Sequence, residues 1–340
     1  MEPILSRIYL DHAATTPMRP EATTAVIEGM TRWANPSSPH AEGRAARAAL
    51  EDARRRIAAA LDWPHHVILT SGASESAAIA LRGRTGIGLA AIEHDAVLRA
   101  AEQPVMLGVD MGGRVVAQDS SPAAIALQSA NSETGVVQPH VAGFRIADCS
   151  QTAGKLPLPD ADIVIVSAHK LGGPPGIGAL LVRDLGTIEP TGGQERGYRG
   201  GTENLPGALG FAAALEAPRD WVAGMEQLRA DLDAAIIAAG GEVVAQGSPR
   251  IATIAAYRMP GVSSAAQLIR LDMAGFAVSA GSACSSGSMR PSHVLAAMGY
   301  TPDVAAEIVR VSFGWTTTPD DVARFARAWA AIARDVVRTA

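Results

Sequence analysis

Short apolar segments that end in polar residues constrain this chain more than any other feature. Residues 162–166 read Asp-Ile-Val-Ile-Val and lead directly into Ser-Ala-His-Lys. Similar segments lie at residues 67–70, 88–92, 124–130, 144–147 and 178–182. Near-continuous apolar runs are typical of strands that are buried on both faces of a mostly parallel sheet. Because ligands bind at the carboxyl ends of such strands, we expect the functional site among the polar residues that follow them.

A change of pattern near residue 205 predicts a second domain. Beyond it the sequence favours helices at residues 206–216, 220–239, 264–274, 292–298 and 319–338, with strands at 251–257 and 307–313. We therefore expect a large α/β domain over residues 15–205 and a smaller α+β domain over residues 206–340. Residues 1–14 can pack on either domain, including the smaller one.

One connection between predicted strands is unusually short. Residues 132–143 join the strand that ends near Asn131 to the strand that begins near Phe144, and they contain two glycines and a proline. A crossover between parallel strands needs a dozen or more residues and usually contains a helix. We expect no helix here, and a thinly covered face of the sheet.

Composition excludes several classes of function. The chain of 340 residues is 48% hydrophobic, has a formal net charge of −5 and lacks a run of Lys or Arg, which argues against nucleic acid as its main partner. Its apolar runs end well before the roughly 20 residues that a membrane span needs, and its N-terminus has no block of signal-peptide type. Two cysteines cannot form a disulfide framework, so we expect a cytoplasmic protein.

Lys170, Asp148 and a Ser-rich turn form the candidate site. Lys170 follows a buried strand, where low-dielectric surroundings favour the neutral amine that Schiff-base chemistry requires. Asp148 ends a second apolar segment and is suited to pair with a pyridinium nitrogen. The turn at residues 71–74 precedes a predicted helix and is suited to bind a phosphate. Each feature alone also fits a structural role, namely a solvent-reaching lysine or a helix cap, but the combination favours a bound cofactor.

The two cysteines differ in their surroundings. Cys284 lies in a stretch of small and polar residues, 279–288, which predicts an exposed loop where its thiol can be reached and can move. Arg290 and His293 are near enough in sequence to favour the thiolate, although an incidental surface thiol is the alternative. Cys149 follows Asp148 at the end of an apolar segment, and we expect it to be buried and without chemistry.

A series of ordered motifs runs through nearly the whole chain. They are YLDHAATTP (9–17), NPSSPH (35–40), SGASE (71–75), EH (93–94), ETGVVQP (133–139), DCSQ (148–151), SAHK (167–170), GQERG (193–197), GTEN (201–204), GSACSS (281–286) and SHVL (292–295). Together they resemble the cysteine desulfurases of the NifS/IscS type, which are pyridoxal-phosphate (PLP) enzymes of the class V aminotransferase group. The resemblance implies the fold type I of PLP-dependent transferases, also called aspartate aminotransferase-like. The GSACSS segment is the motif most specific for desulfurases.

The resemblance implies roles for particular residues. Lys170 would carry the cofactor as a Schiff base, Asp148 would bind the pyridine nitrogen, and Gln151 the phenolic oxygen. His94 would stack over the ring and assist proton transfer. The phosphate would be held by Ala73, Ser74, Ser167 and His169, together with Thr202 from the other subunit of a homodimer. Arg310 would bind the substrate carboxylate, and no metal ion is implied.

One departure from the family pattern concerns the substrate side of the site. Relatives commonly have Asn-Asn-Glu where this chain has Asn131, Ser132 and Glu133. Because Ser132 is shorter than asparagine, its contact with cofactor and substrate is weakened, mediated by water or taken over by Asn131.

The implied reaction converts L-cysteine to L-alanine and leaves a persulfide on Cys284, from which an acceptor protein collects the sulfur. The alternatives are a class V aminotransferase, a selenocysteine lyase or a degenerate, non-catalytic sulfur-transfer scaffold. The sequence leaves open whether the sulfur feeds iron–sulfur cluster assembly, tRNA thiolation or another pathway.

Overall fold

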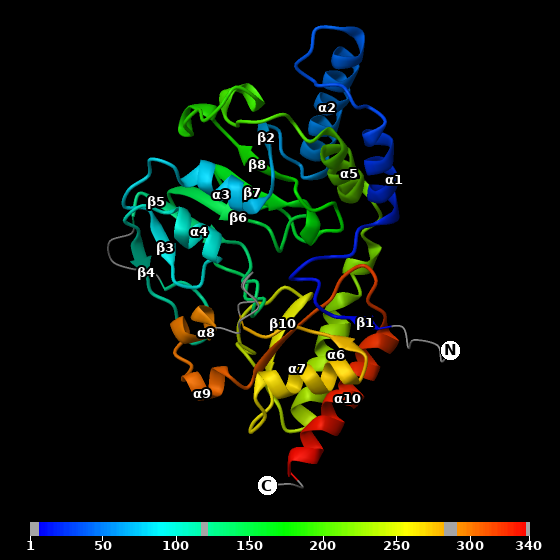
Figure 1. The fold of residues 1–340 in the computed structure, drawn as a ribbon. Helices are drawn as coiled ribbons and strands as arrows, with labels where there is room; N and C mark the ends of the chain where they lie inside the picture. Colours follow the sequence, from blue (N-terminus) through cyan, green and yellow to red (C-terminus); the bar gives the residue numbers. More distant parts are fainter. Residues whose placement is uncertain (1–6, 117–121, 282–290, 338–340) are drawn as a thin grey trace.

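The computed structural model describes residues 7–116, 122–281 and 291–337, and its larger sheet has seven strands in the order β2-β8-β7-β6-β5-β3-β4 (Figure 1). These strands are β2 (His66–Thr70), β3 (Gly88–Ala90), β4 (Val105–Leu107), β5 (Ala124–Gln128), β6 (Phe144–Asp148), β7 (Ile163–Ser167) and β8 (Gly178–Val182). Neighbouring pairs from β4 through β7 are parallel, whereas β8 runs antiparallel to both β7 and β2. The predicted α/β class and mostly parallel sheet are confirmed.

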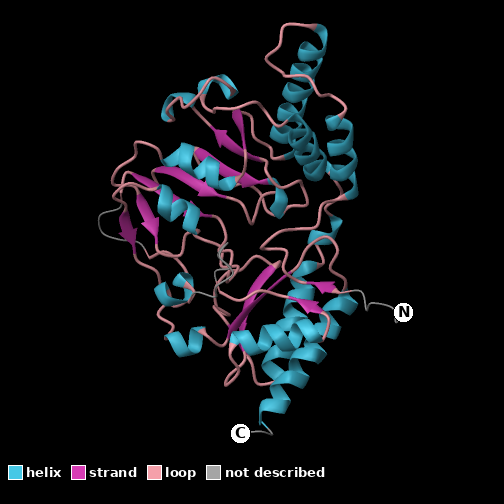
Figure 2. Cartoon of the chain, in the orientation of Figure 1, coloured by secondary structure: helices cyan, strands magenta, loops and turns pink. Residues whose placement is uncertain are grey.

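Helices cover both faces of this sheet, as Figure 2 shows. They are α1 (Pro20–Met30), α2 (Ala41–Ala60), α3 (Ala73–Leu81), α4 (Asp95–Ala100) and α5 (Leu205–Glu216). On β2, Val67 and Leu69 face the apolar cluster formed with α2 and α5, whereas Ile68 faces a second cluster formed with α3. The continuous apolar pattern of the strands therefore has the predicted cause, which is burial on both faces.

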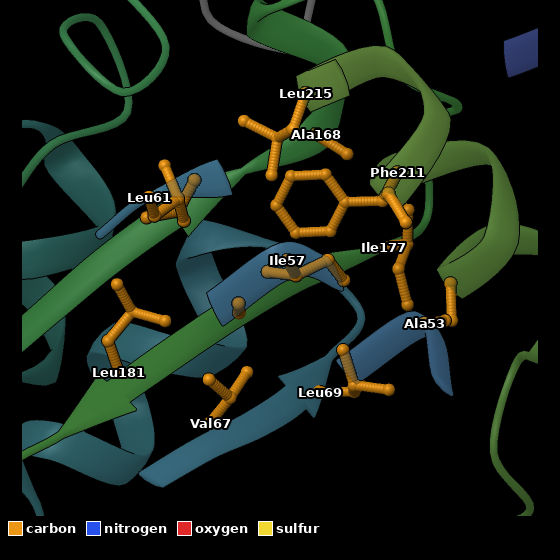
Figure 3. Packing of buried hydrophobic residues seen from close by; sticks show 14 of the residues in the cluster. Ala53, Ile57, Leu61, Val67, Leu69, Ala168, Ile177, Leu181, Phe211 and Leu215 are labelled. Atoms are coloured by element: carbon orange, nitrogen blue, oxygen red, sulfur yellow. The ribbon is translucent and has the colours of Figure 1, made fainter. Parts of the chain in front are cut away.

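The cluster between the sheet and α2 is built around an aromatic ring. Phe211 of α5 is fully buried and lies between Ile57 of α2 and Leu215 and Ile177, as Figure 3 shows. Burial of one such side chain contributes on the order of 2 kcal/mol from the transfer of its apolar surface out of water. This packing fixes α5 and α2 on the side of the sheet opposite α3.

The second sheet has three antiparallel strands in the order β12-β10-β9. They are β9 (Glu242–Val243), β10 (Ile254–Arg258) and β12 (Ile308–Ser312). The helices of this part are α6 (Met225–Ala238), α7 (Ser264–Met273), α8 (His293–Ala297), α9 (Pro302–Ala305) and α10 (Pro319–Val337). Trp329, Phe325, Tyr257 and Phe313 are fully buried in its core.

The N-terminal segment packs on this second part. Strand β1 (Ile8–Tyr9) pairs in parallel with β11 (Phe276–Ala277), and Leu10 belongs to the apolar cluster around Trp329. Helix α5 instead belongs to the cluster of the larger sheet through Phe211. We therefore propose that the domain boundary follows α5, near residue 217, and not residue 205.

The short connection between β5 and β6 contains no helix; residues 132–143 are all described and form turns and isolated bridges. They dock on the smaller sheet instead. The amide of Ile251 donates to the carbonyl oxygen of Gly135 (2.8 Å), and the amide of Val137 donates to that of Pro249 (2.8 Å). Gly135 has a φ of 76°, and a Cβ there would lie 2.3 Å from the carbonyl oxygen of Ile254, so only glycine fits this contact.

Within the described residues, no helix is both long and apolar enough to cross a membrane.

Candidate active site

A cavity of about 340 Å³ lies at the carboxyl ends of the parallel strands, where the sequence predicts the site. It is lined by residues 71–75, His94, Ala96, Val97, Gln128, Ala130, Ser132, Asp148, Ser150, Gln151, Ser167, His169, Lys170, Pro175 and Gly176. A second cavity, of about 330 Å³, shares His94, Ser132 and Lys170 with the first. Its other lining residues include Ala13, Glu133, Gly281, His293 and Arg310. Lys170 therefore lies between two adjoining compartments.

Lys170 is placed by β7 and the single turn of 3₁₀ helix that follows it, Ala168–Lys170. Its Nζ donates to the carbonyl oxygen of Ala13 at 2.6 Å. Burial, joined by repulsion from the Arg310 guanidinium, lowers the pKa of Lys170 from 10.5 to about 8, although Asp148 and Asp11 oppose the shift. The neutral amine is thus accessible near physiological pH.

Asp148, the last residue of β6, lines the same cavity as Lys170. Its Oδ1 accepts hydrogen bonds from the amide (2.8 Å) and the hydroxyl (2.5 Å) of Ser150. Gln151 donates from Nε2 to the carbonyl oxygen of Ala13 (3.0 Å), while its buried Oε1 has no partner among the described residues. A buried polar atom without a partner, beside a carboxylate in a cavity, indicates a site built for a polar ligand.

The first turn of α3 lines another part of the same cavity and offers hydrogen-bond donors, whereas Asp148 offers a carboxylate. Gly72 caps the helix without a side-chain hydrogen bond, so the free amides of the first turn face the space lined by Ala73 and Ser74. Ser167 and His169 line the same cavity. Free amides at a helix N-terminus favour an anion such as a phosphate.

His94 precedes α4, and its Nδ1 accepts a hydrogen bond from the amide of Ala96 at 3.1 Å. Burial is the main cause that lowers the pKa of His94, and the charge of Lys170 adds to it, against the opposing effect of Asp148. The imidazole is therefore neutral near pH 7.

Arg310 of β12 enters the second cavity from the smaller sheet. Its guanidinium donates to Asp11 Oδ1 (2.7 Å) and to the carbonyl oxygen of Ser132 (2.9 Å). Its buried Nε has no partner among the described residues. Two protein oxygens thus orient the guanidinium of Arg310, and its Nε–H group is still free to donate a hydrogen bond. Both properties suit this guanidinium to bind a carboxylate.

Asn131, which is one of the alternatives for the substrate contact, does not line either of the two cavities. Its Oδ1 accepts from the amides of Glu133 and Thr134 and from the Thr134 hydroxyl, and its Nδ2 donates to the carbonyl oxygen of Ile92. These bonds stabilise the turn that replaces a helical crossover, so the amide is already occupied. Ser132 lines both cavities.

Three further predicted residues lie elsewhere. Thr202 is exposed and lines a separate surface cavity with Met30 and Trp33, which leaves its predicted role across a subunit interface untested. Cys284 lies outside the described residues. Cys149 is fully buried, as predicted, and burial raises the pKa of its thiol to about 12.

Sequence reasoning assigns no role to three residues that the structure brings to the site, Asp11, Ala13 and Glu133, and relates a fourth, His293, only to the thiolate of Cys284. Asp11 orients Arg310, and the carbonyl oxygen of Ala13 accepts from both Gln151 and Lys170. Glu133 and His293 line the second cavity, where the Ser292 hydroxyl donates to Glu133 Oε2 and His293 Nε2 lies 2.9 Å from the carbonyl oxygen of Glu93. All four lie in quoted motifs, but a motif does not reveal which of its atoms face a cavity.

Comparison with known proteins agrees with this geometry. Residues 8–325 match the family described as aminotransferase class-V. The chain therefore belongs to the class V aminotransferases, whose fold and lysine-centred cavity it has.

Similar proteins and structures show to which family within the class V aminotransferases the chain belongs. The chain is 36% identical over 365 residues to a protein of Bacillus subtilis named putative cysteine desulfurase IscS 1, covering 94% of this chain and 96% of that one. It superimposes on a NifS-like protein from Rickettsia africae with a TM-score of 0.85 and 27% identity, covering 96% and 99%. The structure of SspA in complex with cysteine gives a TM-score of 0.76 and 28% identity, covering 90% and 98%. Within its class, the chain is a member of the cysteine desulfurase family, whose cofactor is PLP.

Proposed function

We propose that this protein is a PLP-dependent cysteine desulfurase that converts L-cysteine to L-alanine and carries the removed sulfur as a persulfide on Cys284. The observation that carries the proposal is the position of Lys170. Its amine, with a pKa lowered to about 8, lies between a cavity that ends in Asp148 and a cavity that Arg310 enters.

The first cavity suits PLP in the chemistry of its donors. Lys170 would hold the cofactor covalently, Asp148 would keep its ring nitrogen protonated, and the partnerless amide of Gln151 would bind a ring oxygen. The phosphate would bind the first turn of α3 through Ala73 and Ser74, with Ser167 and His169 beside it, and Thr202 of a second subunit would complete the set. His94, neutral and in the same cavity, is suited to lie against the ring.

The second cavity suits the substrate. Arg310 would bind the carboxylate of L-cysteine, and Ser132 would approach the same molecule from the other side. When bound, PLP supplies an electron sink for the pair that remains when the substrate loses its α-proton. The neutral amine of Lys170 would remove that proton, since no other amine lines the two cavities among the residues that the structure describes.

Cys284 would then attack the substrate sulfur as a thiolate. An S–S bond forms and the C–S bond of the substrate breaks. The β-carbon keeps the electron pair of the C–S bond and takes up a proton, and the α-carbon regains the proton that it lost, which gives L-alanine. Gly281, which precedes Cys284 by three residues in the sequence, lines the substrate cavity. Its position supports this assignment.

We also propose that the protein acts in the cytoplasm as a homodimer and passes its sulfur to an acceptor protein. The dimer is supported by a group of apolar side chains on and after α1: Ile27, Met30 and Trp33 are 61%, 70% and 79% exposed. Met30 and Trp33 adjoin Thr202 in one surface cavity, where a second subunit would cover them.

The test is an assay of alanine and sulfide formed from L-cysteine in the presence of a thiol reductant. We expect equal amounts of both products, and neither from the Lys170→Ala variant. Cys284→Ala should keep the visible absorbance of the bound cofactor and lose sulfide release, whereas Cys149→Ala, the matched control, should keep both. Sulfide release by Cys284→Ala at the wild-type rate would refute the persulfide role, and alanine formation by Lys170→Ala would refute the proposed function.

A further inference from the structure

The first cavity contains a carboxylate at the end where the phosphate of PLP would bind. Glu75 belongs to the first turn of α3 and lines this cavity together with Ala73 and Ser74. Its Oε2 accepts a hydrogen bond from the amide of Ser71. A phosphate group carries about two negative charges at neutral pH. A carboxylate at this position therefore opposes the binding that the free amides of the turn favour.

The other residues that line this cavity do little to balance the charge of Glu75. Among the lining residues that the structure describes, Lys170 is the only lysine and none is an arginine, whereas Asp148 adds a second carboxylate. The ring of His169 is neutral, because burial and the charge of Lys170 lower its pKa to about 4. A cation that balances Glu75 therefore has to come from outside the lining residues.

Arg199 supplies this cation. Its Nε lies 3.0 Å from Glu75 Oε1 and 3.2 Å from Glu75 Oε2, and the two side chains are only 17% and 28% exposed. Burial alone would raise the pKa of Glu75, but the hydrogen bond from Ser71 and the charge and hydrogen bonds of Arg199 outweigh burial and lower this pKa. Glu75 is thus a carboxylate at neutral pH, and Arg199 is its only ion-pair partner in the described part of the chain.

The backbone of Arg199 is held in place independently of this ion pair. The amide of Gln194 donates to the carbonyl oxygen of Arg199 (3.0 Å), and the amide of Arg199 donates to that of Gln194 (3.3 Å). Next to Gln194, the carboxylate of Glu195 accepts from the amide of Leu69 on β2, the strand that leads into the turn at residues 71–74. Arg199 and Glu75 are therefore placed on one framework, which brings the guanidinium behind the first turn of α3.

We propose that Arg199 is a positioning residue of the phosphate site: its guanidinium neutralises Glu75, so that the first turn of α3 receives a phosphate without an uncompensated carboxylate beside it. The inference deepens the proposed function, because it rests on PLP binding in the first cavity. Arg199 does not line that cavity among the described residues and acts through Glu75.

The test is the affinity for PLP of the full chain freed of its cofactor, followed by visible absorbance. In Arg199→Met, the Kd for PLP should rise about tenfold or more, because the charge of Glu75 is left unpaired beside the phosphate. Adding Glu75→Gln to this variant should bring the Kd back to within about threefold of the wild-type value, because the opposing charge is then gone. Arg183→Met removes an exposed arginine paired with Asp160 and, as the matched control, should leave the Kd unchanged.

Pyridoxal, which has the ring and the aldehyde of PLP but no phosphate, separates the effect of charge from a loss of structure. Its Kd should be the same in the wild type, in Arg199→Met and in the double variant. Wild-type affinity for PLP in Arg199→Met would overturn the inference. A double variant that binds PLP as weakly as Arg199→Met, or an equal loss of affinity for pyridoxal, would also overturn it, because the ion pair would then act only through the fold. A wild-type chain that forms no visible band with PLP would instead refute the proposed function.

A second variant decides the matter if Arg199→Met does not fold. Glu75→Gln keeps a side-chain oxygen for the amide of Ser71 and removes the negative charge, so that Arg199 is left as a cation near the phosphate. The Kd of this variant for PLP should fall about threefold or more, while its Kd for pyridoxal should stay unchanged. A Kd for PLP equal to that of the wild type or above it would overturn the inference.

Discussion

Glu195→Gln is expected to destabilise the fold strongly, since Glu195 belongs to a buried ion pair. Both oxygens of Glu195, whose side chain is fully buried, accept from Arg54 of α2, at 2.5 and 2.9 Å. One of them also accepts from the amide of Leu69 on β2 (2.8 Å). The pair therefore ties the turn that contains Glu195 to the strand that leads into the phosphate turn. It does so although Glu195 and Arg196 both have positive φ angles, of 49° and 61°.

The magnitude follows from burial. Breaking a buried pair by removing one partner costs about 3–5 kcal/mol, because an uncompensated charge stays inside. Glu51 still contacts Arg54 Nε at 3.1 Å in the variant, so we expect the lower end, about 3 kcal/mol. At a urea slope of about 3 kcal/mol/M, the unfolding midpoint of the holoenzyme would fall by about 1 M.

The matched control is Asp160→Asn, which breaks the exposed pair of Arg183 and Asp160 and should cost less than about 1 kcal/mol. Urea unfolding followed by tryptophan fluorescence measures both variants. Equal midpoints for Glu195→Gln and Asp160→Asn would refute the reasoning, because burial would then have no bearing on the value of the pair.

Three further outcomes are expected. Cys149, buried and with a pKa raised to about 12, should resist alkylation in native Cys284→Ala and react only after unfolding; rapid labelling of the native variant would contradict its burial. Arg310→Lys should raise the KM for L-cysteine about tenfold or more, because the ammonium lacks the fork that binds a carboxylate; an unchanged KM would remove Arg310 from the substrate site. Lys170 becomes neutral as pH rises through about 8, so PLP uptake by the apoprotein, followed by stopped-flow absorbance, should accelerate between pH 7 and 9 and then level off; a rate that still rises beyond pH 10 would indicate an ordinary lysine.

The sequence was most informative where an apolar strand pattern is followed directly by a reactive or charged residue. The strand that precedes Lys170 is predicted at residues 162–166 and observed at Ile163–Ser167, and the strand that leads to Asp148 is observed at Phe144–Asp148. Neighbouring parallel strands end at the same edge of a sheet, so the placement of both residues in one cavity follows from the pattern. Strands β1, β9 and β11, of two residues each, are too short to produce a pattern.

Asn131 and Ser132 show why a motif alone is insufficient to place side chains. The amide of Asn131 is used within the turn of residues 131–136, because that turn replaces a helix and needs its own hydrogen bonds. Ser132, one residue later, faces both cavities. Sequence proximity does not distinguish the two residues, since the turn geometry decides which side chain points outward.

By itself, the sequence determined the buried parallel sheet, the polar edge and the residues that we propose hold a cofactor there, because each depends on the character of a few adjacent residues. Only the tertiary structure decided that Asp11 and Arg310, 299 positions apart, meet beside Lys170, and that Gln151 and Lys170 donate to the same carbonyl oxygen, that of Ala13. Contacts between residues so far apart in the sequence depend on how the two apolar cores of the molecule pack against each other, and on the path of the long connections between them. Hydrophobic periodicity reports the burial of a segment but not the identity of its distant neighbours.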